Sequence, residues 1–203
     1  MPLIATALVG LLFLPGSATA PIAEAKTTAP SALASGEEPS SRRVAPPITD
    51  ATTQTVMLTS YNAVPEQTDE DPTVTASGIP SNPKVIAARS HDLARSLPFG
   101  TIIAIYRSAD DTPGCNFKKV EHLIGYRVIA DTMNARFTKR VDVEFDQTDK
   151  VKVDGVRINP AVAMGLCRGV TIRVVGFVST DHVPQTQEGL ARYVFSKELA
   201  LSK

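Results

Sequence analysis

The chain has 203 residues, of which 43% are hydrophobic and 21% are charged, and its formal net charge is zero. This composition is typical of a globular protein that builds a hydrophobic core. The balanced charge argues against nucleic acid or an anionic membrane surface as a partner, because neither would attract the protein over distance.

The first segment is typical of export. Residues 4–14, IATALVGLLFL, form an apolar run followed by Pro15 and Gly16, as in a secretory signal peptide. The run is shorter than the roughly 20 residues that a membrane-spanning helix needs. We expect cleavage after Ala25, and hence a signal peptide over 1–25 and a periplasmic or secreted protein without stable membrane insertion. No Lys or Arg precedes the run, and a buried N-terminal helix is the alternative.

Residues 26–53 are rich in Ala, Ser, Thr and Pro without an apolar period, which predicts a disordered linker. An ordered domain is predicted over 54–178, with a helical extension over 179–203. In chain order, the patterns predict strands at 56–61, 73–78, 85–88, 101–106, 123–131, 140–145 and 170–178, and short helices at 90–97 and 159–167. Several short strands separated by turn signals predict a small, mainly β barrel or sandwich.

The two cysteines form an even pair in a chain expected to leave the cytosol. Disulfides persist in oxidising compartments, so Cys115 and Cys167 are predicted to be bonded. Two independent buried thiols are the alternative. The sequence predicts no metal site, because the two cysteines lack a histidine at ligand spacing and the aspartates of 146–155 lack EF-hand spacing.

Two aspartates are the candidate chemical groups. In RVDVEF (140–145), the apolar residues alternate with Asp142, which places this aspartate on the opposite face of the predicted strand. Asp131 ends the preceding predicted strand. If these two strands pair through the loop at 132–139, both carboxylates lie near the same mouth of the barrel. A solvated or salt-bridged pair of aspartates is the alternative interpretation.

The residues around this pair resemble the three-aspartate (3D) domain of the double-psi β-barrel superfamily. The matching segments occur in the family's order: TSYNAVPEQTDEDPTVTASG (59–78), VIAARSHDLARSLPFGT (85–101) and IADTMNARFTKRVDVEF (129–145). The superfamily includes the membrane-bound lytic transglycosylase A group, rare lipoprotein A and the expansins. The resemblance implies a six-stranded double-psi β-barrel, here followed by a C-terminal helix.

The resemblance also implies chemistry on peptidoglycan glycan strands by a monomer that needs no cofactor. Asp142 would act as general acid and then base on the bond between N-acetylmuramic acid and N-acetylglucosamine. Asp131 would raise the pKa of Asp142 or position the substrate. Expansin-like relatives loosen polysaccharide without cutting it, so a non-catalytic wall-binding module is the alternative function.

Four further residues are candidates for substrate binding. Thr75, Ser77 and Gly78 of the TASG segment are expected to line the groove, because hydroxyls can bond sugar hydroxyls. Arg140, in the basic segment between the two aspartates, could hold Asp131 or contact peptide carboxylates. The alternative for the TASG segment is a plain strand end, and the alternative for Arg140 is a solvated basic loop.

The third aspartate of the family is open. Many relatives carry it directly after the strand that corresponds to VIAA, where this chain has Arg89 and Ser90. Asp69 and Asp92 are both candidates for the role. A loop or helix-cap position is the alternative for each.

Overall fold

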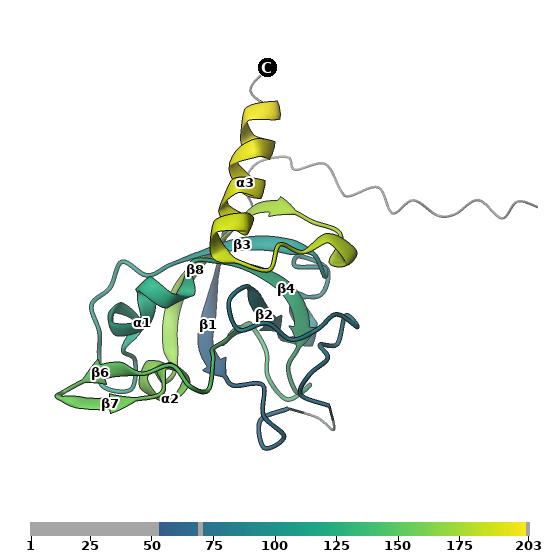
Figure 1. The fold of residues 1–203 in the computed structure, drawn as a ribbon. Coiled ribbons are helices and arrows are strands. Elements are labelled where there is room, and N and C mark those ends of the chain that lie inside the picture. Colours follow the sequence, from purple (N-terminus) through teal and green to yellow (C-terminus); the bar gives the residue numbers. More distant parts are fainter. Residues whose placement is uncertain (1–52, 69–70, 202–203) are drawn as a thin grey trace, which may run out of the picture. The chain divides into compact units, whose positions relative to one another are not determined.

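The computed structural model describes residues 53–68 and 71–201, without the side chains of 198–201 (Figure 1). The predicted signal peptide, all of the predicted linker except Thr53, and Asp69 lie outside the described residues. Six strands close into a barrel in the order β1-β5-β2-β4-β3-β8. Their bounds are β1 Thr53–Tyr61, β2 Ile86–Arg89, β3 Thr101–Tyr106, β4 Tyr126–Thr132, β5 Arg140–Glu144 and β8 Cys167–Phe177. The predicted mainly β class and six-stranded barrel are confirmed.

The barrel is mixed. Strand β1 runs parallel to β5 and β2 runs parallel to β4, while the other four neighbouring pairs are antiparallel. The direct pairing of β4 with β5, which the sequence left as a condition, does not occur, because β2 lies between them. The 132–139 connection therefore crosses from one side of β2 to the other and does not close a hairpin.

The remaining elements are short, apart from the last helix. They are η1 His91–Leu93, α1 Phe117–Ile124, a hairpin of β6 Val151–Val153 and β7 Val156–Ile158, α2 Pro160–Met164, η2 Thr180–His182 and α3 Gln187–Leu201. Helix α1 and the β6–β7 hairpin were not predicted. Residues 73–78 are a turn with one isolated bridge from Val74 to Pro80, not the predicted strand. The predicted helix over 90–97 is reduced to the single turn of η1.

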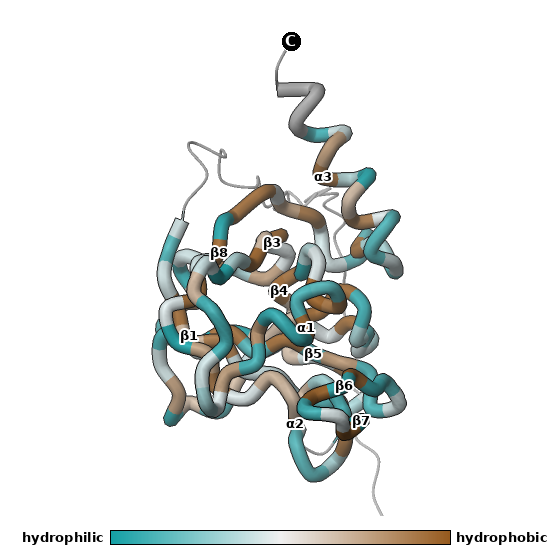
Figure 2. Tube along the Cα trace, turned by 90° about the vertical axis from the view of Figure 1, so that its left-hand side faces the viewer, coloured by the Kyte–Doolittle hydropathy of each residue, from teal (hydrophilic) through white to brown (hydrophobic). Residues whose placement is uncertain are grey.

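The apolar side of the strands builds the core. Val141 and Val143 of β5 are fully buried, as the alternation predicts, and pack with Leu58 of β1. The hydrophobic stretches on β4 and β5 are brown in Figure 2. Helix α1 adds Phe117, Val120 and Ile124, which lie at the spacing of one helical face.

The C-terminal extension takes part in a second apolar cluster. Leu190 and Val194 of α3 are buried with Ile86, Ile102 and Val128 from the barrel strands. The predicted C-terminal helix is therefore present, and its first turns cover the barrel. Along the described residues, none of the helices reaches the length and apolarity required to span a membrane.

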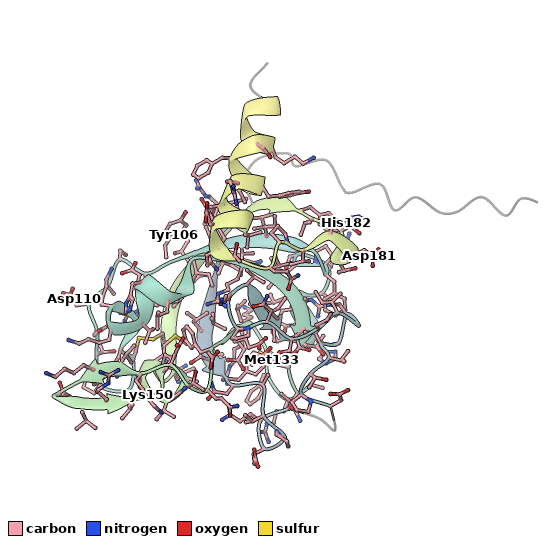
Figure 3. All side chains as sticks on the ribbon, viewed as in Figure 1. Tyr106, Asp110, Met133, Lys150, Asp181 and His182 are labelled. Atoms are coloured by element: carbon pink, nitrogen blue, oxygen red, sulfur yellow. A yellow bond between two sulfur atoms is a disulfide. The ribbon has the colours of Figure 1, made fainter. Side chains whose placement is uncertain are left out.

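Two local constraints fix the barrel ends. Cys115, before α1, is bonded to Cys167 at the start of β8, so the predicted disulfide is confirmed (yellow in Figure 3). Gly100 opens β3 with φ of 90°, and a Cβ there would lie 2.2 Å from the carbonyl oxygen of Val178. Only glycine fits this turn, in which Gly100 bonds to both Ile129 and Val178 through its backbone.

Candidate active site at Asp142 and Asp131

Strand β2 brings the two aspartates to the same place. Ala88 of β2 is in register with Asp142 of β5 on one side and with Asp131 of β4 on the other. Neighbouring strands lie about 4.8 Å apart, so the two aspartate Cα atoms are about 10 Å apart across Ala88. The predicted proximity of the pair is thus found, although it arises from an intervening strand and not from a hairpin.

Both carboxylates line one pocket of about 440 Å³. Figure 3 places Met133, which also lines it, at the lower part of the barrel. The other lining residues come from the end of β1 and the loop after it, from β2, and from the end of β4 and the β4–β5 connection: Tyr61, Glu66, Gln67, Thr68, Ala88, Thr132, Asn134, Arg136 and Phe137. The wall therefore combines acidic, amide, hydroxyl and apolar side chains, a mixture suited to a polar ligand with some apolar surface.

Asp142 carries the larger electrostatic perturbation. Burial raises the pKa of Asp142 to about 6, with a small further rise from the charge of Asp131. The charge of the Arg140 guanidinium opposes the rise. The Oδ1 atom of Asp142 is shielded from solvent and, like the Thr59 hydroxyl, meets no hydrogen-bond partner among the described residues. Asp142 can therefore hold a proton up to about pH 6 at the wall of the pocket.

Asp131 is instead surrounded by donors. Its Oδ1 accepts hydrogen bonds from the backbone N–H groups of Ala76 at 2.9 Å and Thr132 at 2.8 Å. Its Oδ2 accepts one from the Tyr61 hydroxyl at 3.1 Å. Three donors converging on one carboxyl suit an ionised carboxylate, which only accepts hydrogen bonds. The two aspartates are therefore unequal, with Asp131 the acceptor and Asp142 the proton holder.

The TASG segment supports Asp131 and does not line the pocket. Thr75 is buried, and its hydroxyl lies 3.0 Å from that of Ser77. The turn closes with a bond from the Gly78 N–H to the Thr75 carbonyl, at a Gly78 φ of 84°. This turn aims the Ala76 N–H at Asp131. Thr75, Ser77 and Gly78 are thus not among the residues that line this pocket.

Arg140 lies beside the pocket without lining it. Its guanidinium stacks on the Phe137 ring, 4.2 Å from the ring centre, and Arg136 stacks on the same ring at 4.8 Å. The buried Nε of Arg140 has no hydrogen-bond partner within the described part of the chain. These contacts place two cations and an aromatic ring at the pocket rim, and they do not hold Asp131.

Asp92 fixes a loop away from the pocket. Both of its carboxylate oxygens accept from the Lys139 N–H, at 3.2 and 3.0 Å. A hydrogen bond from the Ser90 side chain is the main cause of a lowered Asp92 pKa. Arg89, in the position where relatives carry an aspartate, is buried, donates from Nε to the Leu97 carbonyl at 2.7 Å and stacks on Phe99.

Three site residues were missed by the sequence reasoning. The Tyr61 hydroxyl donates to Asp131, Glu66 lines the pocket, and Glu144 contacts the Tyr61 hydroxyl. The signal for Glu144 was present, since it follows Asp142 by two residues and so shares its side of the strand. Nothing in the sequence links Tyr61 to either acid.

Over residues 53–68 and 71–201, no three His, Cys, Asp or Glu side chains come together in a way that could hold a metal ion. Compared with known proteins, the chain matches no protein-family description and no curated protein.

Proposed function

We propose that this protein is an exported peptidoglycan lytic transglycosylase with Asp142 as its general acid and base. The observation that carries the proposal is the Asp142 carboxyl, whose pKa is raised by burial to about 6 and which faces a 440 Å³ pocket. A general acid works best when its pKa lies near the working pH, because it is then both protonated and ready to transfer the proton.

In the proposed reaction, Asp142 donates its proton to the glycosidic oxygen as the bond to the muramyl anomeric carbon breaks. The muramyl 6-hydroxyl attacks that carbon and forms the new C–O bond, and its proton passes to the Asp142 carboxylate. The products are a 1,6-anhydromuramyl end and a free glucosamine hydroxyl. Asp142 returns to its protonated state without a water nucleophile or a second carboxylate nucleophile. Asp131, as an anion across Ala88, opposes ionisation of Asp142 and stabilises positive charge that develops at the anomeric carbon.

The fold supports the double-psi assignment behind this proposal. The barrel has two parallel pairs, β1 with β5 and β2 with β4, each joining strands that are not consecutive in the chain. Two such crossed pairs in a six-stranded barrel are what a double-psi arrangement requires. The Cys115–Cys167 disulfide is consistent with an oxidising compartment, where the murein lies.

The test is digestion of purified murein sacculi, followed by mass spectrometry of the soluble fragments. We expect anhydromuropeptides from the wild-type protein and none from the Asp142→Asn variant. Asp92→Asn is the matched control, because it removes an aspartate that only anchors a loop, and it should release the same fragments. Co-sedimentation with sacculi without soluble product would refute the enzyme and support the wall-binding module.

A further inference from the structure

Glu144 is a buried acid that the proposed reaction does not use. Only 1% of the residue is exposed, and burial is the main cause of its raised pKa. It makes no ion pair: the two salt bridges of the described residues, Lys118–Glu121 and Arg192–Glu188, lie elsewhere. An ionised carboxylate in this position would therefore be costly.

The nearest cation does not neutralise Glu144 by contact. Arg127 of β4 is fully buried, but its guanidinium donates to backbone carbonyl oxygens and not to a carboxylate. The acceptors are those of Pro83, Ile86, Leu123, Ile124 and Glu144. Arg127 lowers the Glu144 pKa only by its charge, and the net shift remains upward. The donors to Glu144 are the Ser81 hydroxyl, 2.5 Å from Oε1, and the Asn82 backbone N–H; both lower its pKa, but burial outweighs them.

Tyr61 joins Glu144 to the site. Its hydroxyl oxygen lies 3.1 Å from Oδ2 of Asp131 and 3.5 Å from Oε2 of Glu144. A phenol has one proton, so it can donate to only one of these oxygens. Burial and the charges of Glu144 and Asp131 raise the pKa of Tyr61 well above its ordinary value, so the phenol stays protonated. If Tyr61 donates to Asp131, its lone pairs face Glu144, and that contact is favourable only if Oε2 carries a proton.

We propose that Glu144 is held protonated and, by donating to Tyr61, fixes the direction of a hydrogen-bond chain that ends on Asp131. The chain runs from Glu144 Oε2–H to Tyr61 Oη, and from Tyr61 O–H to Asp131 Oδ2. Glu144 and Tyr61 are thereby positioning residues: they hold Asp131 as the anion that faces Asp142. This inference rests on the proposed function for its catalytic meaning, but the protonation states can be measured without substrate.

The groups that set the protonation of this hydrogen-bond chain come from each element around it. Asp131 and Arg127 lie on β4, Asp142 on β5, and the Ser81 hydroxyl in the loop before β2. Asp131 disfavours a negative charge on Glu144, whereas Ser81, the Asn82 N–H and Arg127 favour one. Both aspartates disfavour a negative charge on Tyr61. Because Arg127 is occupied by carbonyls, a Gln at 144 can reproduce the protonated acid: its amide donates to Tyr61 and accepts from Ser81.

The experiment is a carbon-13 carboxyl NMR titration of the purified protein. We expect the Glu144 carboxyl to titrate above about 4.3, the ordinary value of a glutamate. We expect Glu144→Gln to leave the Asp142 titration in place and Tyr61→Phe to move it. The proposal is overturned if Glu144 titrates at the ordinary value or below it, or if Glu144→Gln moves Asp142 as far as Tyr61→Phe does.

The sacculus digestion provides a separate readout of the same variants. We expect Glu144→Gln to retain the wild-type rate, and Tyr61→Phe and Glu144→Leu to lose about tenfold, the effect of one lost hydrogen bond at the site. Tyr61→Phe is the conservative variant if Glu144→Leu does not fold. If the wild-type protein is inactive but shows the expected NMR titrations, the proposed function is overturned and the hydrogen-bond chain stands. If the protein is active but the titrations differ from those expected, only the hydrogen-bond chain is overturned.

Discussion

Replacing Asp142 with Asn should make the protein more stable at neutral pH. The pKa of Asp142 is raised in the folded state to about 6 from its ordinary value of 3.8. A carboxyl whose pKa is raised only in the folded state resists ionisation there but not in the unfolded chain. The protonated carboxyl therefore contributes its full stability below about pH 4, and this contribution is lost as the pH rises through about 6. A shift of two units corresponds to about 3 kcal/mol above pH 6. Asn cannot ionise and escapes this loss.

The assay is urea unfolding of wild-type and Asp142→Asn protein at several pH values between about 4 and 8. The free-energy difference between the two proteins should be unchanged up to about pH 4, then grow in favour of the variant by up to about 3 kcal/mol at pH 8. Comparing two pH values cancels any constant effect of the amide on packing.

The matched control is Asp92→Asn, which should show the opposite sign. The pKa of Asp92 is lowered, so its carboxylate stabilises the native state at neutral pH, and this contribution disappears as the pH falls. The Asn variant at 92 should therefore lose stability relative to wild type as pH rises. If the free energies of unfolding of wild type and Asp142→Asn differed by a constant amount at every pH, the conclusion that Asp142 keeps its proton up to about pH 6 in the folded state would be refuted.

The other predictions concern the reaction and the framework of the barrel. The rate of sacculus solubilisation should fall about tenfold per pH unit above about pH 6, because Asp142 must be protonated to act as the acid; a rate that rises there would contradict this role. Replacing Cys115 and Cys167 with Ser should lower the free energy of unfolding by about 4 kcal/mol, since the bond closes a loop with a sequence separation of 52, and chemical denaturation would measure it. Gly100→Ala should cost about 2 kcal/mol or more in the same assay, because a Cβ meets a backbone carbonyl and φ is positive; an unchanged midpoint would show that the turn can adjust. Arg127→Met should cost about 3 kcal/mol or more, since it leaves several buried carbonyls without their donor, and a neutral effect in thermal unfolding would contradict that reading.

Local patterns predicted the parts of the fold that depend on local periodicity. The alternation around Asp142 correctly separated Val141 and Val143 from the acid, and the run at 101–106 gave β3 with its observed bounds. The face of Phe117, Val120 and Ile124 had the spacing of a helix, so α1 could have been found by the same reasoning.

What could not be predicted depends on contacts between distant segments. The insertion of β2 between β4 and β5 is decided by which strands close the barrel, and consecutive strands are otherwise expected to pair. Residues 73–78 begin with the strand-forming Thr73, Val74 and Thr75, but the segment turns, and its Ala76 N–H meets Asp131 across 55 residues of chain. The link from Tyr61 to Glu144 spans 83 residues and leaves no periodic signal.

The relative roles of the two aspartates also needed the structure. From the sequence, Asp131 was the residue expected to raise the pKa of Asp142 or to position the substrate. Burial is the largest cause, and the charge of Asp131 adds the smallest contribution, because a strand separates the two. The sequence could identify both acids but could not rank these effects.

The most direct test of the central claim is sacculus digestion in water enriched in heavy oxygen, with mass spectrometry of the new muramyl ends. Intramolecular attack by the 6-hydroxyl predicts anhydro ends that are lighter by one water and carry no label, and these should vanish in Asp142→Asn. Labelled reducing ends would mean that water is the nucleophile, and anhydro ends that persist in Asp142→Asn would mean that another group carries the proton. Either result would contradict the role assigned to Asp142.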